Sequence, residues 1–266
     1  MIRFAMPYER AAVRRLWEAC FADEGGFNDY FFDAWFQPER TLVFEEGGAL
    51  YAMLQMLPYR MHCGRQSRSV TYIYGACTAP EHRRKGLMAQ LLEHSFALDQ
   101  EAGSVASILI PQEDWLFGFY QSFGYQTVFF VDRHEAKRCS EGVTPRHLSC
   151  ADIPQMDRLF RKTAGDTFVE REEDYWRRQI ALFDTLGKGV YGWYEGGALA
   201  AYAFCWENEA QETVGLTEPY AQGLMRTLGI EALSWSSPGG TVPLGCAKWH
   251  DEKYAVSAAY MNLMLN

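Results

Sequence analysis

The stretch from Val70 to Leu98 constrains the fold of this chain more than any other. It begins with a run rich in β-branched and aromatic residues that ends at Pro80, continues through a short basic loop, and passes directly into an amphipathic run. This order predicts a strand, a tight loop and a helix. Because the first turn of a helix has unpaired N–H groups and the positive end of the dipole, the stretch also predicts a site for phosphate groups.

The loop at 81–86 contains three consecutive basic residues, Arg83, Arg84 and Lys85, followed by Gly86. A glycine lets the backbone approach an anion closely, and the basic side chains add positive charge to the amide groups. The loop lacks the Gly-Lys-Ser/Thr ending of a Walker A motif and the three glycines of a dinucleotide fingerprint. A solvated basic helix start is the alternative interpretation.

Residues 83–88, Arg-Arg-Lys-Gly-Leu-Met, resemble the acyl-CoA signature of the GNAT N-acetyltransferases. That signature is an Arg/Gln-x-x-Gly-x-Gly/Ala loop between the fourth strand and the third helix. Met88 departs from it, which the fold can accommodate if the side chain points into the core, because the amide binds the phosphate. Residues 119–125, Phe-Tyr-Gln-Ser-Phe-Gly-Tyr, resemble the FYxxxGF ending of the family's fourth helix. The resemblance implies an N-acetyltransferase that uses acetyl-CoA as co-substrate.

Composition narrows the possible partners. With 48% apolar and 15% aromatic residues the chain is expected to be globular, and it has no apolar run long enough to cross a membrane. The seven cysteines form no C-x-x-C pair and the six histidines show no metal-ligand spacing, so we expect reduced thiols, a cytoplasmic location and no metal. A net charge of −9 argues against nucleic acid and suits a cationic substrate such as an amine. A homo-oligomer is left open.

The chain repeats itself weakly. The segment 46–52, Glu-Gly-Gly-Ala-Leu-Tyr-Ala, recurs at 195–201 as Glu-Gly-Gly-Ala-Leu-Ala-Ala, and each copy predicts a β-hairpin with a Gly-Gly turn. Two helical segments precede each hairpin, which favours a duplicated unit; they lie at 8–20 and 28–36, and at 152–162 and 172–183.

The second copy has lost the phosphate loop. After its hairpin the chain passes from 213–217 straight into Glu218, Pro219 and a helical run in which Gly223 begins a Gly-Leu-Met echo of 86–88. Nothing corresponds to 81–85, and the carboxylate of Glu218 would repel phosphate. We therefore expect one acyl-CoA site, in the N-terminal half.

The predicted fold class is α/β, more closely an α+β mixed sheet flanked by helices, formed by two tandem GNAT folds of which the second is degenerate. The expected domains are 1–136 and 146–266, joined by a linker at 137–145. The helix after the basic loop is expected to begin at Arg84. Tandem units of this kind resemble the enhanced intracellular survival (Eis) family, whose members acetylate amines; we expect the third, sterol-carrier-like domain of that family to be missing.

The resemblance also implies the site residues. Tyr120 matches the tyrosine that the family places beside the CoA sulfur and is expected to donate a proton to the leaving thiolate. The cofactor should be bound by residues at the end of the strand, in the loop and helix start, and on the opposite side of the cofactor. These are Ala76, Cys77, Thr78, Arg83, Arg84, Lys85, Gly86, Leu87, Met88, Ala89, Trp115 and Leu116.

Several alternatives stay open from sequence. The general base could be Glu24, Asp29, Glu113, the Asn266 α-carboxylate or a water molecule. A covalent acyl-enzyme on Cys77 is disfavoured, because no histidine is placed by sequence to activate it. The protein could instead be a non-catalytic acyl-CoA-binding scaffold or an aminoacyl transferase of the Fem type, although the intact phosphate loop counts against the latter.

Overall fold

The chain folds into two compact units. The structure is a computed structural model that describes residues 1–23 and 25–264. The GNAT domain boundaries predicted from sequence stay a prediction, whereas the contacts within the structure divide the chain in an interleaved way. The first unit comprises 1–61, 65–127 and 245–257, and the second comprises 62–64, 128–244 and the segment from 258 onward.

The first unit contains a mixed sheet in the order β1-β2-β3-β4-β5-β13. The pairs β1–β2, β2–β3 and β5–β13 are antiparallel, and β4–β5 is parallel. The last strand comes from the far end of the sequence and lies beside β5. The strands are β1 (Ile2–Phe4), β2 (Thr41–Glu46), β3 (Ala49–Cys63), β4 (Gln66–Thr78), β5 (Ala106–Leu109) and β13 (Val242–Trp249).

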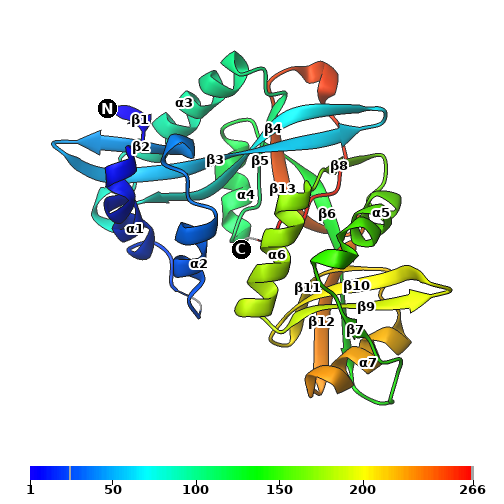
Figure 1. The fold of residues 1–266 in the computed structure, drawn as a ribbon. Helices are drawn as coiled ribbons and strands as arrows, with labels where there is room; N and C mark the ends of the chain where they lie inside the picture. The colour runs from blue at the N-terminus through cyan, green and yellow to red at the C-terminus, as the bar shows by residue number, and fades with distance from the viewer. Residues whose placement is uncertain (24, 265–266) are drawn as a thin grey trace. The chain divides into compact units, whose positions relative to one another are not determined.

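Helices cover both faces of this sheet. In Figure 1, α1 and α2 lie on one side of strands β2 to β4 and α3 lies on the other. An apolar cluster joins α3 and α4 to the strands, with Leu91 and Leu92 fully buried in it. The helices are η1 (Pro7–Glu9), α1 (Arg10–Glu18), α2 (Phe27–Ala34), η2 (Pro38–Arg40), η3 (Pro80–His82), α3 (Leu87–Glu101), α4 (Asp114–Gln121) and η5 (Glu252–Tyr254).

The second unit repeats this plan with the sheet order β6-β12-β11-β10-β9-β7. Its β11–β12 pair is parallel, and the other pairs are antiparallel. The elements are β6 (Gln126–Lys137), β7 (Arg146–His147), η4 (Cys150–Asp152), α5 (Ile153–Thr163), β8 (Thr167–Val169), α6 (Glu173–Thr185), β9 (Gly189–Glu195), β10 (Ala198–Trp206), β11 (Glu209–Val214), α7 (Glu218–Leu228) and β12 (Ala232–Pro238).

Both predicted Gly-Gly hairpins are confirmed. The β2–β3 turn has Gly47 at φ 60° and Gly48 at φ 83°, and the β9–β10 turn has Gly196 at φ 56° and Gly197 at φ 84°. Two successive residues with positive φ match the right-handed twist of an antiparallel hairpin, and glycine adopts such angles without steric cost. The mixed α/β fold predicted from sequence is likewise confirmed.

The helix after the basic loop begins later than predicted. Instead of Arg84, the first residue of α3 is Leu87, because Arg84 has φ 63° and Gly86 has φ 77°. Those angles belong to the left-handed region and cannot continue a right-handed helix.

Strands β4 and β5 separate beyond a short ladder. Within the described residues, their parallel register runs from Val70↔Ala106 to Tyr72↔Ile108, while β4 continues to Thr78. The two strands therefore splay apart beyond this ladder. Across residues 1–23 and 25–264, none of the helices combines the length and the apolar character that crossing a bilayer requires.

Candidate functional site

The start of α3 offers backbone N–H groups to an anion. Gly86 occupies the N-cap position, and no side chain of a described residue caps the helix. The first backbone hydrogen bond of the helix runs from the Gln90 N–H to the Gly86 carbonyl at 3.1 Å. The N–H groups of Leu87, Met88 and Ala89 therefore have no acceptor within the helix and are available to a ligand.

Space is open directly above this helix start. Gly86 is exposed, and a Cβ atom placed on it would meet no described atom within 4 Å. The left-handed conformation of Arg84 costs a non-glycine residue about 1 kcal/mol or more. A turn that contains left-handed residues can direct successive N–H groups toward one concave side, as in anion-binding nests.

The predicted basic residues surround this open space. Arg83, Arg84 and Lys85 are all exposed. Arg83 donates from Nε to the Thr78 carbonyl at 3.2 Å, which fixes its side chain beside the end of β4. Neither Arg84 nor Lys85 pairs with a described carboxylate, so both charges are available to a polyanion.

A second strand holds the loop in place. The Ala79 N–H donates to the Tyr51 carbonyl of β3 at 2.8 Å. The rings of Tyr51 and His82 stack with centroids 3.8 Å apart and an interplanar angle of 13°. Together these contacts anchor both ends of η3 to the sheet, and they pre-form the loop before any ligand binds.

The end of β4 is accessible where β5 has left it. Ala76 and Thr78 are half-buried, whereas the side chain of Cys77 is 7% exposed. Gly75 has φ 57°, and a Cβ there would lie 2.2 Å from the Trp17 indole. The strand therefore bends around Trp17, and its backbone groups beyond Tyr72 have no β5 partner in the described register.

The structure brings residues of the strand, the loop and α4 together. One apolar cluster contains Leu87 and Tyr120, with Ala76, Met88 and Leu116 packed against it. Met88 thus contacts the core, as its departure from the family pattern required. Trp115 is different: it is 64% exposed, and its indole N–H donates to the Glu113 carboxylate at 2.7 Å.

Two neighbouring tyrosines differ in how their hydroxyl groups are used. The Tyr125 hydroxyl is hydrogen-bonded to the Ser107 hydroxyl at 2.7 Å, and Tyr125 is 1% exposed. Among the described residues, the Tyr120 hydroxyl has no hydrogen-bond partner. Burial raises the pKa of Tyr120 to about 12, and the Cys246 thiol adds to this rise. Tyr120 is therefore the protonated phenol with an uncommitted hydroxyl.

Comparison with known proteins agrees with this geometry. Residues 1–128 match the family model of the acetyltransferase (GNAT) domain. Those residues contain the β4–loop–α3 site and Tyr120. The N-terminal 128 residues form a GNAT acetyltransferase domain. It is accordingly an acyltransferase with acetyl-CoA as its co-substrate. None of the curated proteins matches the chain by sequence.

Solved GNAT structures share the fold across both units. A GCN5-related N-acetyltransferase from Kribbella flavida is 16% identical with a TM-score of 0.71, and the match covers 97% of this chain and 73% of that protein. One from Anabaena variabilis is 18% identical with a TM-score of 0.69, covering 93% and 72%. Eis1 from Mycobacterium abscessus is 15% identical with a TM-score of 0.63, covering 91% and 66%. At these identities the likeness concerns the fold.

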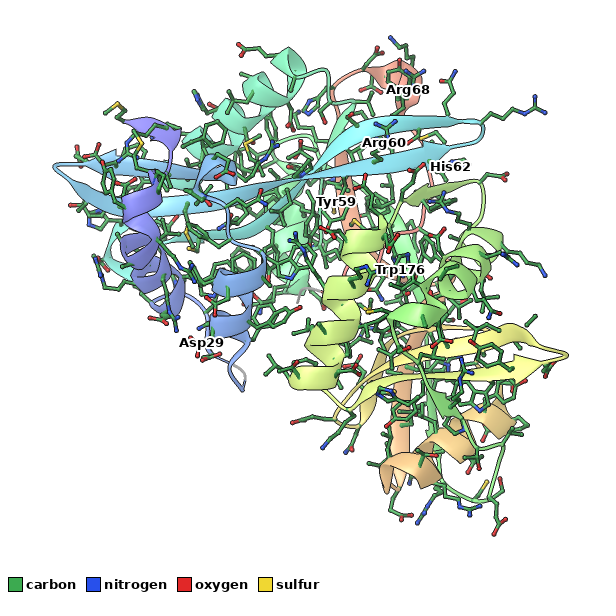
Figure 2. All side chains as sticks on the ribbon, in the orientation of Figure 1. Asp29, Tyr59, Arg60, His62, Arg68 and Trp176 are labelled. Atoms are coloured by element: carbon green, nitrogen blue, oxygen red, sulfur yellow. The ribbon has the colours of Figure 1, made fainter. Side chains whose placement is uncertain are left out.

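The GNAT domain holds its described candidate bases in other interactions. Asp29 lies on α2, its side chain 69% exposed and paired with Arg14 at 2.7 Å (Figure 2). Glu113 is exposed and accepts the hydrogen bond from Trp115. Glu24 and Asn266 lie outside the described residues. Burial raises the pKa of Cys77 well above its usual value, so this residue is a thiol and a poor nucleophile.

Three residues that shape the candidate site were not predicted from the sequence. Tyr51 holds the loop, Cys246 lies near Tyr120, and Gly75 bends β4 around the Trp17 ring. Gly75 carried a signal, because a glycine inside a strand often marks a bulge or a close approach. Tyr51 and Cys246 carried none, since both act through contacts distant in sequence.

Proposed function

We propose that the protein moves an acetyl group from acetyl-CoA to a primary amine, by direct attack in a ternary complex. The observation that carries this proposal is the convergence of the open, basic start of α3 with the Tyr120 phenol on a single apolar cluster. The first would hold the diphosphate, and the second would serve the leaving sulfur. The net charge of −9 suits an acceptor that arrives as a cation.

Each part of the cofactor has a matching part of the domain. The diphosphate would lie over residues 84–89, where three amides and two free cations face one open space. The pantetheine would pair with the backbone of Ala76, Cys77 and Thr78 like an added strand, since β5 has left that edge. An N–H of the same edge would polarise the acyl carbonyl and stabilise the tetrahedral oxyanion. Trp115 and Leu116 would flank the cofactor from α4.

Tyr120 would donate a proton to the leaving thiolate of CoA. With a pKa of about 12 the phenol stays protonated at neutral pH. Thiolate departure from a thioester is easier when a neutral donor stabilises the sulfur, whose thiol has a pKa of about 8.5 in water. The amine must lose its own proton, for which Asp29, Glu113 or a water molecule are the candidates within the described part of the chain.

Two other functions remain as alternatives. A non-catalytic acyl-CoA-binding protein would need the same loop, but it would not need an uncommitted buried phenol. A Fem-type aminoacyl transferase would not need the basic loop. The presence of both features in one cluster favours acetyl transfer.

We also propose the tandem organisation, with GNAT folds at 1–136 and 146–266, and a cytoplasmic location. The repeated hairpins and the matching sheet orders support the first. Seven free cysteines support the second, because thiols persist in reducing compartments.

The test is an assay of CoA thiol release from acetyl-CoA with a panel of polyamines, aminoglycosides and peptides. Turnover with at least one amine, together with an acetylated product of the expected mass, is the predicted result. Tight acetyl-CoA binding without turnover on any amine would favour the non-catalytic alternative.

Replacing Tyr120 provides the sharper experiment. Tyr120→Phe should lower kcat about 100-fold and leave acetyl-CoA affinity within about twofold, because the ring still packs while the proton donor is lost. Tyr125→Phe is the matched control: it should keep kcat but reduce stability by about 1–3 kcal/mol, because Ser107 loses its buried partner. An unchanged kcat in Tyr120→Phe would remove this residue from the mechanism.

A further inference from the structure

Two thiols and a guanidinium meet at the end of β4. The Cys20 Sγ, just past the end of α1, donates to the Thr78 carbonyl at 3.4 Å. The Arg83 Nε donates to the same carbonyl at 3.2 Å. Cys77 precedes Thr78, so it lies next to the carbonyl that Cys20 and Arg83 share, and its thiol is close enough to the Cys20 sulfur for the two groups to interact. Two cysteines from different elements are therefore neighbours beside the loop that the diphosphate would occupy.

The two thiols have opposite acidities. The pKa of Cys20 falls to about 6, because the Cys77 thiol and the Arg83 guanidinium stabilise its thiolate; burial and Glu81 oppose this shift. Burial raises the pKa of Cys77 well above its ordinary value. Cys20 is half-buried and Cys77 is buried. Loss of the Cys20 proton, which gives up its hydrogen bond to the Thr78 carbonyl, leaves a half-buried thiolate beside a protonated thiol, and this suits an attacking and a resolving cysteine.

We propose that Cys20 and Cys77 are a redox-active dithiol that closes to a disulfide, and that this disulfide weakens acetyl-CoA binding. The second half rests on the function proposed above. The oxidant is a peroxide, represented in the experiments by hydrogen peroxide.

The chemistry balances in two steps. The Cys20 thiolate attacks one oxygen of hydrogen peroxide, the O–O bond breaks, and the products are a Cys20 sulfenic acid and hydroxide, which takes a proton to become water. The Cys77 sulfur then attacks the Cys20 sulfur, the S–O bond breaks, and the Cys77 proton leaves with the hydroxide as a second water. Two thiols have lost two electrons to the peroxide.

Closure must disturb the cofactor strand. A disulfide holds its sulfurs about 2.05 Å apart, much closer than two hydrogen-bonded thiols. The ends of α1 and β4 therefore have to move toward each other. Trp17, on the same helix, already packs against Gly75 without room for a Cβ, so β4 cannot shift as a rigid strand there. The strain falls on Cys77 and Thr78, whose backbone would pair with pantetheine and whose carbonyl orients Arg83.

This combination is missing at Cys139, Cys205 and Cys246. Burial alone raises the pKa of Cys205, and it raises that of Cys246 against a hydrogen bond from Thr127. Cys139 is exposed and serves as a control for nonspecific oxidation. The proposal therefore predicts selective oxidation of one pair among seven thiols.

The covalent half is tested by mass spectrometry. Protein treated with hydrogen peroxide, blocked with N-ethylmaleimide and digested should yield a cross-linked peptide joining Cys20 to Cys77, two hydrogens lighter than the sum. Cys77→Ala should instead stop at an oxidised Cys20, and Cys139→Ser should cross-link like wild type. Alkylation of Cys20 should show a midpoint near pH 6. Sulfinic acid on Cys20 without a cross-link, or oxidation spread over all thiols, would overturn the dithiol.

The functional half is tested by calorimetry with acetyl-CoA on reduced, oxidised and re-reduced protein. The oxidised form should bind about tenfold or more weakly, and dithiothreitol should restore the affinity. Cys20→Ser should show the same affinity with and without peroxide. A cross-link with unchanged affinity would refute the coupling. Failure of the reduced wild type to bind would refute the proposed function instead, because the cross-link is read by mass alone.

Discussion

The same strand-to-helix junction occurs in both units, and its surroundings are opposite. In the first unit the junction before α3 is basic, glycine-capped and open. In the second unit α7 begins at Glu218 directly after Thr217, and the acidic residue lies in its first turn. Gly223 lies inside α7 instead of before it, so the Gly-Leu-Met echo does not mark an equivalent position.

The linker covers α7. The Val143 N–H donates to the Pro219 carbonyl at 2.8 Å, and the Gln222 Oε1 accepts from the Cys139 N–H at 2.8 Å. A Cβ on Gly223 would lie 1.8 Å from the Val143 carbonyl oxygen. Main chain from 139–143 therefore fills the space next to this helix, the kind of space that stays open at α3.

The edges of β4 and β11 differ in the same way as the two junctions: the edge of β4 is open and that of β11 is filled. In the second unit the β11–β12 ladder pairs Glu209 with Ser234 and Ala210 with Trp235. Further along, the Thr213 hydroxyl donates to the Ser236 carbonyl at 3.0 Å. The Asn262 side chain donates to the Gln211 carbonyl at 2.8 Å. The protein's own groups thus occupy this edge, whereas β4 is half-exposed beyond its ladder. Under the proposed function, what fills the space between these diverging strands would decide whether a unit of this kind binds the cofactor.

Charge reversal in the open junction should have the largest effect. Arg83→Glu with Arg84→Glu should weaken acetyl-CoA binding about 100-fold, since two charge-assisted interactions are replaced by repulsion. The measurement is calorimetry. Glu218→Arg is the matched control in the covered junction and should create no second site, because the linker stays in place. Binding by the double variant within a few-fold of wild type would break the comparison.

A methyl group in the covered junction should come next. Gly223→Ala should lower the unfolding free energy by about 2 kcal/mol, because the new Cβ meets a backbone carbonyl that cannot rotate away. Gly118→Ala, inside α4 with no described atom within 4 Å of its Cβ position, should instead be neutral or stabilising. Denaturant unfolding checks both. Equal effects of the two substitutions would mean that the linker does not pack closely on α7.

The smallest expected effect concerns the conformation of Gly86. Gly86→Ala places a Cβ in open space but at φ 77°, so it should cost about 1 kcal/mol of stability. Acetyl-CoA affinity should fall about fivefold, because the first-turn amides lose part of their alignment. Calorimetry and denaturant unfolding measure the two effects. A loss of stability without any loss of affinity would separate the loop from the cofactor.

Local patterns were sufficient to predict much of this molecule. The Gly-Gly hairpins and the strand–loop–helix stretch depend on turn residues and periodicity within a few positions. The left-handed Arg84 was not predictable, since arginine normally favours a helix, and α3 therefore started three residues later than expected. The pairing of β13 with β5 and the contact of Cys20 with Cys77 join distant segments, for which the chain carries no local signal.

The stoichiometry of acetyl-CoA binding tests the central claim most directly. Titration of the reduced wild-type protein by calorimetry should give one site per chain, which binds about 100-fold more weakly in the Arg83→Glu/Arg84→Glu variant and is unchanged in Glu218→Arg. Two sites per chain would contradict the covered second junction, and no binding at all would contradict the assignment of the α3 start to the diphosphate of acetyl-CoA.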